Sequence, residues 1–86
     1  MKHTRIGVIG IVINTPEVIA DRVNDYLGQH SSMIVGRMGI PYEKRGISVI
    51  SLIVEGSTDE IGALTGKLGR LKGVMVKSAL TTKEYE

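Results

Sequence analysis

Few residues in the 86-residue chain have the type and spacing that a chemical function requires. Arg37 stands alone in an apolar segment, where it could bind an anion or ligand near the following hairpin, or pair with Glu55 at the sheet rim. His3 and His30 are isolated and match no metal-ligand pattern, and His30 is expected to be solvated. Cysteine is absent, which excludes disulfides, thiolate metal sites and cysteine nucleophiles. The sequence therefore predicts no catalytic residue, no metal site and no cofactor.

A row of glycines is the second feature with chemical meaning. Gly62, Gly66 and Gly69 recur at i, i+4 and i+7 in a segment with helical spacing of leucines. Each glycine costs a helix ~1 kcal/mol relative to alanine, so the row indicates a compensating close approach. The approaching group is a subunit, a ligand or, in the simplest interpretation, the other helix of the same chain. Membrane pairing is excluded, because no apolar run reaches roughly 18 residues.

Runs rich in β-branched residues predict the strands that must position these groups. They span residues 6–13, 33–40, 47–54 and 74–80. The charged segment 41–46 reads as a hairpin loop between the second and third strands. Gly10 lies inside the first strand, where its expected role is a close backbone approach rather than phosphate binding.

The first helix is predicted from a start signal and an apolar stripe. Thr15 is pushed to extended geometry by the following proline, and Pro16 fits the first helical position. Asn14 and Glu17 have the spacing of a capping box, and the stripe ends near Gly28.

The second helix begins with the capping box formed by Ser57 and Glu60. Its leucine stripe continues over residues 61–71, with basic residues favourably placed at the C-terminal end. Gly73 is expected to stop it.

The resulting element order is βαββαβ, for which right-handed crossovers give a four-stranded antiparallel sheet in the order 4-1-3-2. Both helices then lie on one face, so the predicted fold class is α+β, ferredoxin-like. We expect residues 1–86 to form one such domain.

The helix-free face of that sheet should be polar, but the two central strands are apolar on both sides. One side carries Ile6, Val8, Val12, Ile47, Val49 and Ile53, and the other side carries Ile9, Ile11, Ile13, Ile50, Leu52 and Val54. An uncovered face of this kind favours aggregation. We therefore expect a homodimer or homotetramer that buries the face or joins sheets at an edge. The alternative is that strand register or bulges hide part of it.

Charge and composition argue against two further partner classes. The formal net charge is +2 and the basic residues form no stripe, which is a weak field for nucleic acid. The central strands carry no aromatic residue for stacking RNA bases. Direct nucleic-acid binding and membrane insertion are therefore not expected. The N-terminal apolar run is interrupted by Gly7 and Gly10 and lacks a cleavage site, so we expect a cytoplasmic protein.

Two stretches of the chain resemble known regulatory families. The turn opening the first helix resembles that of ACT-type regulatory domains, which often place Asp or Asn two residues before proline. Residues 61–74, together with residues 37–41, are similar to the iron-only hydrogenase system regulators. These are short stand-alone ACT-like proteins, related in fold to the C-terminal domain of the nickel-responsive repressor. The resemblance covers essentially the whole chain.

The resemblance implies a non-enzymatic, oligomeric ACT-like regulator that binds a small effector, often an amino acid, at a subunit interface. Glu17 stands where ACT domains usually have glycine, and the repressor's metal ligands and DNA-binding domain are absent. The implied effector-binding residues are Asn14, Thr15, Pro16 and Arg37, with Gly62 and Gly66 across the interface.

One alternative function remains open at this point. The chain could be an interaction module that acts only through a partner protein and has no ligand of its own. Its contact surface would be the glycine row or the hairpin between the second and third strands.

Overall fold

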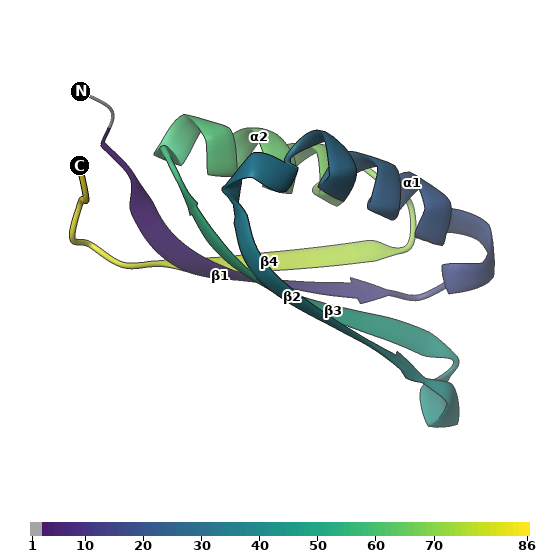
Figure 1. Cartoon of the computed structure of the whole chain (residues 1–86). Helices are drawn as coiled ribbons and strands as arrows, with labels where there is room; N and C mark the ends of the chain where they lie inside the picture. Colours follow the sequence, from purple (N-terminus) through teal and green to yellow (C-terminus); the bar gives the residue numbers. More distant parts are fainter. Residues whose placement is uncertain (1–2) are drawn as a thin grey trace.

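The computed structural model describes residues 3–86 and has the predicted order of elements. The strands and helices are β1 (Arg5–Ile13), α1 (Pro16–Gln29), β2 (Ile34–Tyr42), β3 (Ile47–Gly56), α2 (Thr58–Gly69) and β4 (Val74–Leu80). The sheet is antiparallel in the order β2-β3-β1-β4. Both helices lie on one side of it (Figure 1), which confirms the ferredoxin-like prediction.

The core lies between the sheet and the two helices. Alternate residues of the central strands point into it, because side chains of a strand alternate between faces. The fully buried members are Ile9, Ile11 and Ile13 of β1, Leu52 and Val54 of β3, Val23 and Leu27 of α1, and Ile61, Leu64 and Leu68 of α2. Each contributes about 1.5–3 kcal/mol through burial of its side chain. The interior is therefore almost entirely aliphatic.

β2 differs from its predicted bounds at both ends. Residues Ser31–Met33 form a 3-10 turn, so the strand begins at Ile34 rather than at residue 33. It continues to Tyr42, and the hairpin closes through a 3-10 turn over Glu43–Arg45 with Gly46 at φ 67°. The hairpin of β2 and β3 consequently extends past the rest of the sheet (Figure 1).

The end of α2 also differs from the prediction. The helix stops at Gly69, and Arg70 is its C-cap. The Leu71 amide then donates to the Leu68 carbonyl at 3.1 Å, and Gly73 turns the chain into β4 at φ 82°. The glycine ends the loop rather than the helix, because its left-handed backbone is needed at the turn.

Gly7, not Gly10, is the glycine that permits a close approach in β1. A Cβ at Gly7 would collide with the Leu80 side chain and lie 2.7 Å from the Ala79 carbonyl oxygen. A Cβ at Gly10 would meet only the Lys77 carbonyl oxygen, at 4.0 Å. The prediction for Gly10 is therefore wrong, because its side of the sheet is open.

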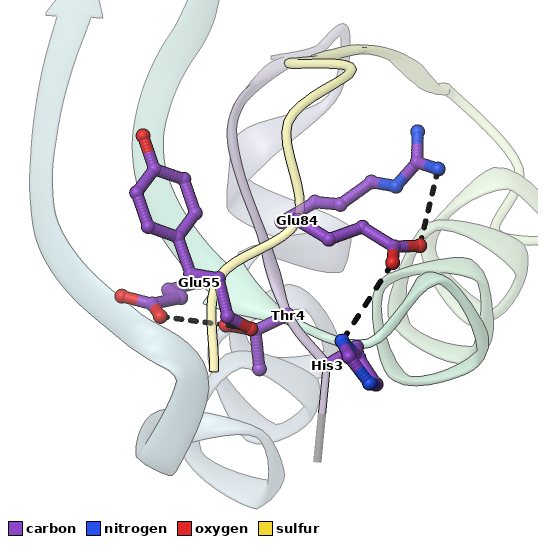
Figure 2. A network of polar contacts seen from close by, with 6 residues as sticks. His3, Thr4, Glu55 and Glu84 are labelled. Atoms are coloured by element: carbon purple, nitrogen blue, oxygen red, sulfur yellow. Dashed lines mark hydrogen bonds and ion pairs between the residues drawn. The ribbon is translucent and has the colours of Figure 1, made fainter. Parts of the chain in front are cut away.

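The C-terminal tail returns to the start of β1. The amide of Tyr85 donates to the Thr4 carbonyl at 2.7 Å, and the Thr4 amide donates to the Tyr85 carbonyl at 2.8 Å. In Figure 2, Glu84 reaches the His3 imidazole at 3.7 Å, and its other oxygen lies 3.5 Å from the Arg5 guanidinium. Residues from opposite ends of the sequence thus form one network.

The surface opposite the helices is open, as the sequence predicts. We call it the helix-free face, and strand register and alternation define its members. They are Ile6, Val8, Gly10 and Val12 of β1, Gly36, Met38, Ile40 and Tyr42 of β2, Ile47, Val49, Ser51, Ile53 and Glu55 of β3, and Met75, Lys77 and Ala79 of β4. Large apolar side chains on it are about half exposed, for example Val8 at 49% and Met38 at 63%.

Candidate functional site

The turn between β1 and α1 carries three of the predicted effector residues, Asn14, Thr15 and Pro16. The Asn14 amide donates to the Gly73 carbonyl at 2.8 Å, which ties this turn to the loop before β4. A Cβ on Gly73 would lie 3.1 Å from the Thr15 hydroxyl oxygen, so the two loops pack closely. These residues therefore lie at one end of the sheet, on a turn that the loop before β4 stabilises.

The start of α1 has no side-chain cap, so the predicted capping box of Asn14 and Glu17 is wrong. Thr15 is the N-cap, and its carbonyl accepts from the amides of Val18 and Ile19 at 3.0 and 3.1 Å. Pro16 follows and fixes the backbone at N1, which removes one amide that would need a partner. The Asn14 and Thr15 side chains remain exposed at the positive end of the helix dipole.

Arg37 lies on the helix side of the sheet and not at its rim with Glu55. It pairs with Leu52 in register, and its guanidinium donates to the Asn24 side-chain oxygen of α1 at 2.9 Å. Glu55 instead accepts a hydrogen bond from the Thr4 hydroxyl at 2.6 Å (Figure 2). The predicted ion pair is therefore wrong.

A β-bulge causes this change of side. The register of β2 shifts between Ile34 and Gly36, so one extra residue, Val35, enters the strand. An extra residue reverses the alternation of every side chain that follows it. Pro41 is level with the end of β1, so Arg37 lies about 13 Å along the sheet from the α1 turn. Within one chain, Arg37 and Asn14 therefore do not contribute to a common site.

Gly62 and Gly66 share an open hollow of about 410 Å³ between α2 and β4, which Thr65, Gly69 and residues 76–78 complete. A Cβ at Gly62 or Gly69 would meet nothing within 4 Å, and one at Gly66 would meet only the Arg70 side chain at 4.0 Å. The expectation that the row packs against the first helix is therefore wrong. The two glycines lie together, but on a different surface from the α1 turn.

A second hollow, of about 400 Å³, lies where α1 ends and α2 begins, and no residue pattern predicted it. His30 contributes to it, is half-buried, and contacts the Lys67 ammonium at 3.1 Å, so its imidazole is only partly solvated. Burial and the Lys67 charge lower the pKa of His30, and Glu60 opposes this shift. Within residues 3–86, no three His, Cys, Asp or Glu side chains gather as metal ligands would.

The fold is that of an ACT-like domain. A solved ACT domain, from the GTP pyrophosphokinase of Chlorobium tepidum, superposes with a TM-score of 0.69 at 17% identity over 93% of this chain and 89% of that chain. The chain belongs to the TM1266-like family, described as "Iron-only hydrogenase system regulator, putative", whose model matches residues 5–78.

Solved structures agree with this assignment. Protein TM1266 from Thermotoga maritima has a TM-score of 0.86 at 35% identity, over 90% of this chain and 96% of that one. A PII-like signalling protein from Thermus thermophilus shares the fold alone, with a TM-score of 0.63 and 12% identity over 94% and 90% of the chains. No curated protein matches the chain significantly. Among residues 3–86, no helix has the length and apolarity needed to cross a membrane.

Proposed function

We propose that this chain is a regulatory protein of an iron-only hydrogenase system that binds a small carboxylate-bearing effector at the α1 turn. The observation that carries the proposal is the open start of α1 in a chain of this family. By contrast, the start of α2 is closed by its own capping box: the Glu60 amide donates to the Ser57 hydroxyl at 3.1 Å, and the Ser57 amide donates to the Glu60 carboxylate at 2.8 Å.

The chemistry of the turn suits an effector such as an amino acid. The positive end of the α1 dipole stabilises a carboxylate, while the Val18 and Ile19 amides already donate to the Thr15 carbonyl. The exposed Asn14 carboxamide and Thr15 hydroxyl add a donor and an acceptor each for the rest of the molecule. Pro16 keeps the turn rigid, so little conformational entropy is lost on binding.

We further propose that the site is completed at a subunit interface. Gly62 and Gly66 line an open hollow on a different surface of the chain, so they can meet an effector only across such an interface. Without Cβ atoms they leave room for its side chain. Arg37 keeps guanidinium donors beyond its bond to Asn24, and it is the candidate contact for a second anionic group.

We also propose a binding role without catalysis or cofactor, in the cytoplasm, where a regulator of hydrogenase expression or maturation acts. A thermal-shift screen of amino acids and nucleotides tests the central claim. We expect one class of amino acid to raise the melting temperature of the wild-type protein, and Asn14→Ala to remove that shift.

Ser57→Ala is the matched control, because it weakens the other helix start. It should lower the melting temperature itself but keep the ligand-induced shift. If no compound stabilises the wild type, or if Asn14→Ala responds like the wild type, an effector site at the α1 turn is excluded.

A second candidate function is an interaction module that works only through a partner protein. The open glycine row favours it, because three exposed or half-exposed glycines on a helix have no partner within residues 3–86 that explains them. Gly66→Leu places a side chain in that hollow, where a Cβ would meet only the Arg70 side chain at 4.0 Å. The module hypothesis predicts that this variant loses a partner in a pull-down while its oligomeric state is unchanged.

A further inference from the structure

We propose that the helix-free face is covered by a second copy of this chain, packed sheet against sheet with the helices outside. This proposal shares one assumption with the proposed function, which is that the chain self-associates. It concerns a different surface, because the α1 turn and the glycine row do not belong to the helix-free face. Use of both surfaces together would give a homotetramer, and use of this face alone a homodimer.

The composition of the helix-free face is that of a buried interface. Lys77 and Glu55 are its only charged members, in a chain of which 23% is charged. Its remaining members are apolar residues, glycine or serine. Depletion of charge at the centre of a patch is the compositional signature of interface cores. Solvent contact at so many aliphatic side chains would otherwise be an aggregation hazard.

The size of the face is sufficient for a stable dimer. Strands of nine residues, such as β1 and β2, extend about 30 Å, and four strands about 4.8 Å apart cover roughly 500 Å² per copy. Two copies together bury about 1,000 Å², which reaches the lower bound for a specific interface. The exposed apolar side chains, among them Ile40 at 52% and Met75 at 55%, are spread across this whole footprint.

The shape of the helix-free face allows a second copy of the chain to pack against it. Gly10 and Ser51 are paired neighbours in its central row, and Ser51 borders a shallow hollow of about 220 Å³. A two-fold axis along the strands lays β3 over β1 of the other copy and β2 over its β4. Lys77 of β4 then lies over β2 of the other copy, so the two Lys77 side chains are kept apart. Aligned sheets pack in this way about 10 Å apart.

Charge favours a second copy over other occupants. A nucleic acid or an anionic membrane surface requires a cluster of cations, and the face offers Lys77 alone. Because the face is nearly neutral, two copies meet without repulsion between like charges. Closed two-fold assemblies of this kind are the commonest soluble oligomers.

Light scattering after size exclusion tests the proposal on the full chain. We expect Val8→Lys to halve the molar mass of the wild-type assembly, because a lysine on an exposed strand position is tolerated in the free subunit but not in a dry interface. Ile53→Lys, on β3, should do the same. Val18→Lys is the matched control, since Val18 is 73% exposed on α1 and lies off the face.

A measurement without substitutions gives a second readout. With dilute hydrogen peroxide, exposed methionines oxidise faster than buried ones. We expect Met38 and Met75 in the wild type to oxidise as slowly as Met33, which is 6% exposed in the core, and to become fast in Val8→Lys.

The proposal is overturned if the wild type is a monomer up to about 100 µM, or if the assembly survives both lysine variants. It is also overturned if Met38 and Met75 oxidise rapidly in the wild type. An effector response at the α1 turn is read by the thermal-shift screen, so the two proposals can fail separately.

Discussion

Leu52 and Ile53 are neighbours on β3, yet one is fully buried and the other is 49% exposed. The same contrast holds along the whole sheet, because its two faces carry the same aliphatic residue types. The helices cover one face, and nothing in residues 3–86 covers the other. The residue pattern of a strand thus indicates which side chains require burial. Whether a single chain can bury them depends on how many layers cover the sheet.

Substitution of these two neighbours gives the largest expected effect. Leu52→Ala should lower the free energy of unfolding by about 2–5 kcal/mol, since it leaves a cavity in the core. Ile53→Ala should cost less than about 1 kcal/mol in dilute protein, because its side chain remains half solvated there. Chemical denaturation at two protein concentrations measures both. Equal losses at low concentration would show that the two faces do not differ within the subunit.

A change on the outer side of the covering layer should be smaller and opposite in sign. Gly62→Ala should raise the free energy of unfolding by about 0.5–1 kcal/mol, because alanine favours the helix and the new Cβ meets nothing within 4 Å. The same denaturation experiment measures it, with the more enclosed Gly66→Ala alongside. A loss of stability that grows with protein concentration would instead indicate a partner at the glycine row.

The smallest effect concerns the contact that joins the two covering helices. Because the pKa of His30 is lowered in the folded state, the unfolded chain binds more protons between that pKa and about 6.5. Stability should therefore fall slightly as pH decreases through this window, because the group is half-exposed and solvent screens its charge. His30→Gln should remove this part of the pH dependence in thermal unfolding curves. An unchanged slope would contradict the assignment.

The fold could be predicted because its determinants are local. Alternating or continuous β-branched runs, the Ser57 capping box and the leucine stripe of α2 each specify an element within a few residues. The order of the elements and the handedness of crossovers then leave few topologies. The helix-free face followed from the same alternation. Element ends were less accurate, because short 3-10 turns such as Ser31–Met33 have no strong signature.

The contacts of the candidate site could not be predicted in the same way. A bulge at Val35 reverses the alternation of β2, and it turns Arg37 from the rim toward Asn24. No residue pattern around Val35 marks the insertion. The pair of His30 and Lys67 lies 37 residues apart in the sequence, so it depends on how the helices pack. The α1 turn was located correctly, but its hydrogen bonding was not.

The hydrogen bonds between Thr4 and Tyr85 make the chain nearly a closed ring. A short linker could join the two ends, and new ends could be opened at the exposed turn Glu43–Arg45. Such a circular permutant keeps every strand pairing, since spatial order in the sheet does not depend on where the chain starts. It would also convert the contact that spans the longest stretch of sequence into a local one, and so should speed folding.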